Sequence, residues 1–187
     1  MDLSLPKAFD ATDESNKTVA KAKQALAKKF SWKKRDVLYD AVDLAVTLIA
    51  LERYDEALEV CQFLGQFQFD GGFNLWCAIE MALVLQARLH RRKGEQEAAQ
   101  ACLRRVQEAG FVDDRLEGSM LDRNGAVAES VREGDTKWEF DARQGLAMEL
   151  AFIIELGGSE KCPVPVMEKQ WEENLARLRE LMAMKRK

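Results

Sequence analysis

The stretch VLYDAVDLAVTLIALERYDEALEVCQFL, residues 37–64, decides the fold. Its first half is apolar almost without interruption, and its second half places apolar residues at the three- and four-residue spacing of an amphipathic helix. Only a short polar run at Glu52 and Arg53 separates the two halves. Helices joined by so short a turn run in opposite directions and pack together. The stretch therefore predicts an antiparallel helix pair, with helices over residues 37–51 and 55–68.

The same pattern returns further along the chain. A second strongly apolar segment covers residues 74–93, and its partner helix is expected at 95–109. A third apolar segment ends near residue 156, and a last amphipathic helix follows Pro163 and Pro165, since proline suits a first helical turn. No run of five or more residues alternates as a strand does. We therefore predict an all-α fold of about seven main helices without a sheet.

The start of the second predicted helix, Tyr54-Asp55-Glu56-Ala57-Leu58, resembles the opening of the second helix of a tetratricopeptide repeat (TPR). In that family a small residue lets the paired helices approach closely, a role that falls to Ala57 and, in the second copy, to Ala99. Gly94 stands in the second turn, where the first has Glu52. From Ala57 to Ala99 the interval is 42 residues, against about 34 in the consensus repeat. The resemblance covers residues 37–109 and implies helix pairs stacked as a TPR-like right-handed α-α superhelix.

The length of 187 residues favours a single domain with one core. We divide it into a loose leader (1–12), the TPR-like core (37–109), an acidic irregular insertion (111–135) and a C-terminal helix pair (136–187). Within the insertion, Asn124-Gly125 and Gly134 predict breaks between short helices. Thr136 and Glu139 match a capping box at the start of the next helix.

The sequence has no pattern that marks an enzyme or a cofactor site. A zinc site needs three or four ligands, and His90 is the only histidine beside four scattered cysteines. Phosphate-binding and nucleophile-elbow motifs are absent from the sequence. We therefore expect no catalytic, cofactor-binding or metal-binding residues. A secretory signal and an apolar run long enough to span a membrane are also missing, so we expect a cytoplasmic protein.

One basic run is the only hint of nucleic-acid binding. Between Lys17 and Arg35 the chain carries eight Lys and Arg residues and no acid. Such a run can neutralise phosphates, but it is also typical of the solvated outer face of a terminal helix. We favour the solvated face, because the net charge of the chain is −4.

Polar residues that interrupt the apolar helices mark the candidate partner-binding surface: Asp40, Asp43, Thr47, Glu80 and Arg88. They lead to our first hypothesis, a non-catalytic protein–protein interaction module on a TPR-like scaffold. The small, acidic, helical chain also resembles bacterial immunity proteins, which neutralise a cognate toxin by binding it, and an acidic surface would steer it towards a basic toxin or effector. A third hypothesis is a small-molecule-binding or enzymatic helical domain with a pocket among the apolar helices.

Overall fold

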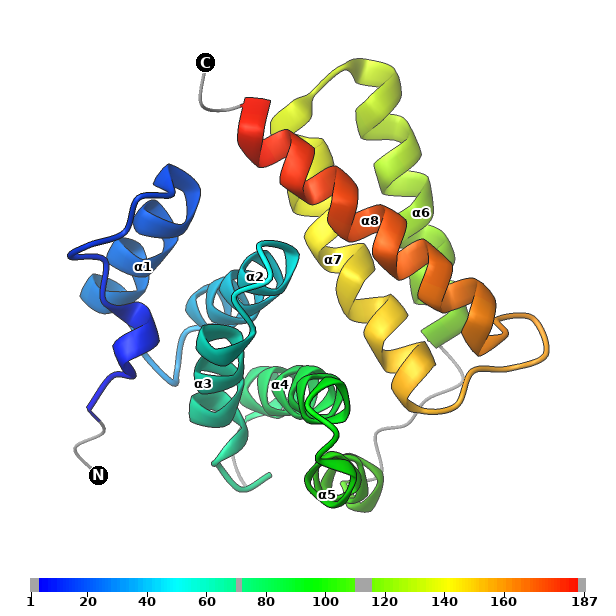
Figure 1. The fold of residues 1–187 in the computed structure, drawn as a ribbon, viewed down its shortest axis with the longest axis horizontal. Coiled ribbons are helices and arrows are strands. Elements are labelled where there is room, and N and C mark those ends of the chain that lie inside the picture. Colours follow the sequence, from blue (N-terminus) through cyan, green and yellow to red (C-terminus); the bar gives the residue numbers. More distant parts are fainter. Residues whose placement is uncertain (1–3, 70–71, 110–115, 185–187) are drawn as a thin grey trace.

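The structure, a computed structural model, describes residues 4–69, 72–109 and 116–184. Over these ranges it is all-α, with eight α-helices, one short 3-10 helix and no strand, which confirms the predicted fold class. The elements in chain order (Figure 1) are η1 (Lys7–Phe9), α1 (Lys17–Lys29), α2 (Arg35–Ala50), α3 (Tyr54–Gly65), α4 (Phe73–Arg92), α5 (Gln96–Glu108), α6 (Leu116–Glu133), α7 (Thr136–Glu155) and α8 (Val164–Met184). In the described ranges no helix has the length and apolar character needed to cross a membrane.

Helix α2 is the centre of the fold. Eleven of its sixteen residues are buried, which places apolar contacts around nearly its whole circumference. It packs against α1 and α3 on its outer side, and against α4, α7 and α8 on the others. From α2 to α5 each helix packs against the next, and Figure 1 shows the four lying side by side. A helix with so few polar positions is stable only when other helices cover it in this way.

Three helix pairs are joined by the same tight turn. Each turn has one residue with a left-handed backbone, at Glu52 (φ 61°), Gly94 (φ 79°) and Gly134 (φ 71°). In each, the following N–H bonds back across the turn to a carbonyl oxygen of the helix just ended: Arg53 to Leu48 (2.9 Å), Glu95 to His90 (2.9 Å) and Asp135 to Ser130 (3.1 Å). The turn between α6 and α7 is thus a third copy of this turn, and the sequence pattern did not predict it.

The third pair does not extend the row of helices. Helices α5 and α6 share no extensive contact over their described residues, whereas α7 packs against α6 and α8 and also against α2 and α4. In Figure 1, α7 passes the ends of α2 and α4, with α8 alongside it. The C-terminal helices therefore fold back over the α2–α4 face instead of leaving it open.

The segment predicted as an irregular insertion, 111–135, is largely one helix. Residues 110–115 lie outside the described ranges, but α6 runs without a break through Asn124 and Gly125. Met120 and Val127 are buried at helical spacing, and α6 packs along α7. That burial outweighs the helix penalty of about 1 kcal/mol for a glycine. The break predicted at Gly134 is present.

Two smaller details also differ from the sequence predictions. The leader is anchored over its described residues, because Phe9 is buried against Phe30 and Phe63 (ring centroids 5.8 and 5.6 Å apart). The residue that caps α7 is Asp135, not Thr136, and its carboxylate accepts the N–H groups of residues 137 and 138 at 2.9 Å. A carboxylate at this position satisfies two orphan donors and faces the positive end of the helix dipole.

Candidate functional site

The five residues predicted to line a partner-binding surface lie in different surroundings. Thr47 is buried under α7: its hydroxyl donates to the carbonyl oxygen of Asp43 (2.8 Å) and accepts from Gln144 Nε2 (2.9 Å). Gln144 also donates to that carbonyl oxygen at 3.0 Å. Thr47 therefore joins α2 to α7 and is not available to a partner.

Asp40 and Asp43 follow one face of α2 towards its N-terminus. Asp40 is exposed and Asp43 is half-buried. Burial raises the pKa of Asp43 to about 7, and the negative charges of Asp40 and Asp141 add to the rise against the opposing charge of Arg123. Burial, with the nearby Asp36, also raises the pKa of Asp40. Asp40 is therefore accessible to a partner, whereas Asp43 is half-buried and partly neutral near pH 7.

Glu80 is a core residue of α4. Its exposed fraction is 9%, and its Oε1 atom has no hydrogen-bond partner among the described residues. Burial raises the pKa of this carboxyl to about 7. A side chain in this position contributes to the interior and offers little surface to a protein partner.

Arg88 lines a cavity. This junction pocket, of about 310 Å³, lies where the ends of α2, α4 and α7 meet the side of α8. It is lined by four arginines (Arg88, Arg91, Arg92, Arg179), four glutamates (Glu52, Glu155, Glu168, Glu172), the rings of Tyr54 and Trp171, and the aliphatic Ile49, Leu89 and Leu175. Its charges are balanced. Because α7 and α8 cover the α2–α4 face, the five predicted residues do not form a single open groove.

A second cavity lies at the start of α3, beside η1, the segment that follows it and the middle of α1. This acidic groove, of about 430 Å³, is lined by six carboxylates (Asp10, Asp13, Glu14, Asp55, Glu56, Glu59), three cations (Lys7, Lys23, Arg53) and Ala8. Six negative charges against three positive ones leave an excess of three negative charges. An excess of one sign in a concave surface concentrates the field that a charged partner meets.

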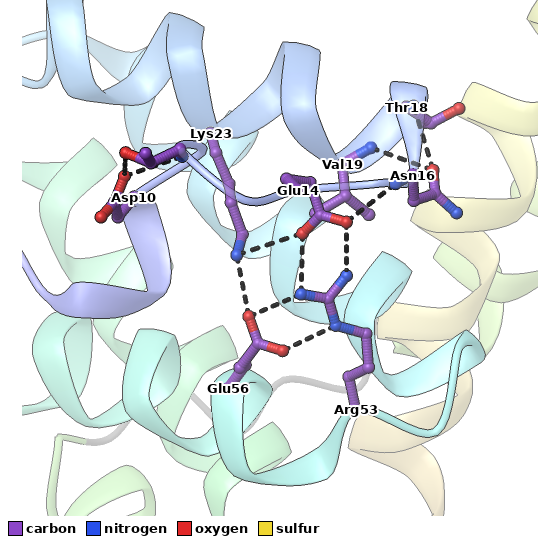
Figure 2. Close-up of polar contacts among 9 residues, drawn as sticks. Asp10, Glu14, Asn16, Thr18, Val19, Lys23, Arg53 and Glu56 are labelled. Atoms are coloured by element: carbon purple, nitrogen blue, oxygen red, sulfur yellow. Dashed lines mark hydrogen bonds and ion pairs between the residues drawn. The ribbon is translucent and has the colours of Figure 1, made fainter.

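Four of these residues form the floor of the groove, which we call the charge square: Glu14, Lys23, Arg53 and Glu56. Figure 2 shows both cations between both carboxylates. Lys23 Nζ lies 3.3 Å from Glu14 and 2.8 Å from Glu56, and Arg53 lies 2.7 Å and 2.6 Å from the same two carboxylates. The side chains of Lys23 and Glu14 are each 4% exposed. The square ties α1 and the segment just before it to the start of α3.

The charge square fixes the ionised state of its buried carboxylate. Burial by itself raises the pKa of Glu14, but hydrogen bonds from the Arg53 guanidinium, the Asn16 amide and Lys23, together with the charge of Arg53, outweigh it and bring the pKa to about 2. Glu56 is shifted in the same direction, first by its hydrogen bonds to Arg53. The floor is therefore a neutral and fully paired unit at pH 7.

The charge on the open part of the groove comes from the remaining residues. Asp10 accepts the N–H and the hydroxyl of Thr12, and Asp55 pairs with Lys93 at 2.6 Å. Asp13 is exposed and Glu59 half-buried, and neither has a charged partner in the part of the chain that the structure describes. These two carboxylates are free to meet a cation.

Sequence reasoning missed this site because it placed Lys23 in a uniformly solvated basic run. One signal was available: Lys23 lies four residues after Val19 and three before Leu26, on the apolar stripe of α1, and all three are buried. A lysine in such a stripe needs a carboxylate partner. The sequence could not show that Glu14 and Glu56 are the partners of Lys23, since this pairing depends on how α1 lies against α3.

The described residues contain no group of three or more His, Cys, Asp or Glu side chains arranged to hold a metal ion. The model of one protein family, described as a family of unknown function (DUF6707), matches residues 4–180 of this chain. No curated protein and no solved structure matches it.

Proposed function

Because the chain belongs to the DUF6707 family, whose function is unknown, we propose its role from its own surfaces: a non-catalytic protein–protein interaction module that binds a basic protein partner through the acidic groove. The observation that carries the proposal is the charge of that groove, six carboxylates against three cations around a cavity of about 430 Å³. Complementary charge of this kind speeds encounter with a basic partner and disfavours acidic ones.

The rigid floor of the groove supports the proposal. Since Glu14, Lys23, Arg53 and Glu56 are paired with one another, the segments that carry the surrounding carboxylates are joined before a partner arrives. A surface that is ordered in advance loses less conformational entropy on binding. The open carboxylates, Asp13 and Glu59 first among them, would then pair with Lys or Arg side chains of the partner.

A scaffold role fits the helix pairs. We propose that α2–α3 and α4–α5 are TPR-like repeats, a view supported by their shared turn and by the 42-residue interval from Glu52 to Gly94. Because α7 and α8 cover the face between them, binding in this proposal uses the outer groove beside α1 and α3, not the inner face of the repeats.

A non-catalytic role is consistent with the state of the candidate nucleophiles. Burial raises the pKa of the thiols of Cys61, Cys77 and Cys102, so they stay protonated at neutral pH. A protonated thiol is a weak nucleophile. The imidazole of His90 is paired with Glu95 on the same turn. The four cysteines are free, which supports a reducing, cytoplasmic location for the proposed module.

A bacterial immunity protein that neutralises a basic toxin is the second candidate. It is a special case of the same proposal, favoured by the same groove, in which bound acidic side chains would cover the basic active site of the toxin. Nucleic acid is disfavoured as a partner, because one of the eight cations of the basic run, Lys23, is buried in the charge square.

The proposal can be tested with a fluorescent peptide of about twelve residues rich in Lys and Arg. We expect the chain to bind it at low salt, and the double variant Asp13→Lys/Glu59→Lys to bind about tenfold more weakly, because two groove carboxylates become cations. Fluorescence anisotropy gives both dissociation constants.

The matched control is Glu97→Lys/Asp122→Lys, which changes the net charge equally at exposed positions outside the groove. It should weaken binding less than about twofold. If both double variants weaken binding to the same degree, net charge and not the groove attracts the peptide, and the proposal fails.

A further inference from the structure

The junction pocket is separate from the acidic groove and has different chemistry. It lies between the α2–α4 layer and the helices α7 and α8 that fold back over it. Boundaries between packed layers are common places for small-molecule sites, and a volume of about 310 Å³ is at the lower end of the usual range. The size favours a compact ligand over a cofactor.

The floor of the junction pocket is closed by ion pairs. The side chain of Glu155 is 0% exposed and lies between Arg88 (3.2 Å) and Arg91 (2.9 Å). Arg88 also holds Glu168 through both of its terminal nitrogens. With its charges already matched, this floor offers a ligand a fixed surface and no free ionic partner.

The walls of the pocket are aromatic and aliphatic. The Arg88 guanidinium lies over the Trp171 ring at 4.3 Å, and the Arg92 guanidinium lies over the Tyr54 ring at 4.0 Å. Leu89 completes the apolar part of the lining beside them. Trp171 is only 2% exposed, so its ring supports the wall from behind, whereas the half-buried Tyr54 offers ring surface to an apolar ligand body.

The rim supplies one uncommitted charge of each sign. In the part of the chain that the structure describes, Arg92 has no carboxylate partner and Glu172 has no cationic one, and both are exposed. By contrast, Arg179 donates to the carbonyl oxygen of Ala50 at 3.0 Å, closing the end of α2. A purely anionic ligand would meet Glu172, and a purely cationic one would meet Arg92.

We infer that the junction pocket binds a small zwitterion with an apolar body, of which an aromatic or branched α-amino acid is the simplest form. Its carboxylate would pair with Arg92 and its ammonium group with Glu172, while its side chain would lie against the half-buried Tyr54. Only a ligand with both charges satisfies both rim residues in a pocket whose arginines and glutamates are equal in number.

Calorimetric titration with four probes tests the inference. Phenylalanine has both charges and the apolar body, N-acetylphenylalanine lacks the ammonium group, phenylalanine amide lacks the carboxylate, and alanine lacks the ring. We expect phenylalanine to bind, and each of the other three to bind at least about tenfold more weakly. If N-acetylphenylalanine binds as tightly as phenylalanine, the pocket is an anion site and the inference is wrong. Absence of binding by all four at millimolar concentration also overturns it.

Variants at the rim locate the site. Arg92→Gln and Glu172→Gln should each weaken phenylalanine binding about tenfold, and both should fold, since both side chains are exposed. Arg104→Gln and Glu97→Gln, at exposed positions of α5 outside the pocket, should leave binding unchanged. Phenylalanine binding that survives both rim variants would place the ligand elsewhere and refute the assignment. None of these results depends on the acidic groove.

Discussion

The helix pairs α2–α3 and α4–α5 have the same type of turn but differ in the residues that they bury. The turn residues Glu52 and Gly94 are 42 positions apart. When the two pairs are aligned by this interval, Leu38 corresponds to Glu80 and Leu48 corresponds to His90. Both leucines are fully buried, and the glutamate and the histidine are almost fully buried. At these two positions the first pair is apolar, and two of its charged residues, Arg53 and Glu56, lie in the charge square at its edge. The second pair places ionisable groups inside. A common backbone frame therefore allows two different ways of handling charge.

The largest effect is expected where the first pair holds its charges. Lys23→Met should lower the free energy of unfolding by about 3 kcal/mol, because it leaves the buried Glu14 carboxylate with fewer partners. We take the lower end of the range for broken buried ion pairs, since Arg53 still contacts both carboxylates of the square. Urea unfolding followed by circular dichroism measures the change.

Lys21→Met, at an exposed position of the same helix, is the control and should change stability by less than about 0.5 kcal/mol. The square also predicts a response to acid. Because the pKa of Glu14 is about 2 in the folded state against an ordinary value of 4.5, its contribution is complete above about pH 4.5 and is lost as the pH falls towards 2. Equal losses for both lysine variants would show that the square does not hold the first pair together.

The second pair should respond to pH in the opposite direction. The carboxyl of Glu80 has an ordinary pKa of 4.5 and a pKa of about 7 when folded. Between these values the folded state holds a proton that the unfolded state has lost, so the free energy of unfolding falls as the pH rises from about 4.5 to about 7. Glu80→Gln removes this titration and should be about 2 kcal/mol more stable than the original chain at pH 8.

The measurement for Glu80 is the difference between the two proteins at pH 5 and at pH 8, which cancels the titration of Asp43 common to both. The stabilisation should be large at pH 8 and small at pH 5. Glu97→Gln, on the exposed face of α5, should show no such pH dependence. If Glu80→Gln is destabilising at pH 8, the buried carboxylate has a stabilising partner. The two helix pairs would then not differ in the cost of a buried charge.

The sequence was sufficient for the features that arise locally. The periodicity of residues 37–64 predicts α2 and α3 and the turn at Glu52, and the second copy predicts α4 and α5. The path of α7 was not predictable, because α2 is apolar on most of its surface and its pattern does not say which helix covers each side. For the same reason Thr47 and Arg88 were expected at a partner surface, whereas they contact Gln144 of α7 and Glu168 of α8.

The acidic groove and the junction pocket each depend on such non-local packing. The groove needs residues from the leader, α1 and α3, and the pocket needs the ends of three helices beside α8. Glu14 and Glu155 have no unusual sequence neighbours that mark them as buried. Their roles follow from helix–helix contacts across more than 30 residues of chain, which local patterns do not encode.

The smallest expected effect concerns the shared turn itself. Glu52 and Gly94 have the same left-handed backbone, with φ of 61° and 79°, and a side chain there costs about 1 kcal/mol. Gly94→Ala should therefore lower the free energy of unfolding by about 1 kcal/mol, although the added carbon meets nothing within 4 Å. Glu52→Gly should raise it by about 0.5 kcal/mol, since glycine also loses more entropy on folding.

Glu52→Ala separates the backbone from the charge in this test. It removes the long, exposed pair with Arg179 (3.8 Å) but keeps a side chain at the left-handed position, so it should leave stability nearly unchanged. If Glu52→Ala stabilises the chain as much as Glu52→Gly does, the gain comes from removing a carboxylate beside the end of α2 and not from the backbone. The two pairs would then share the geometry of the turn without sharing its energetic cost.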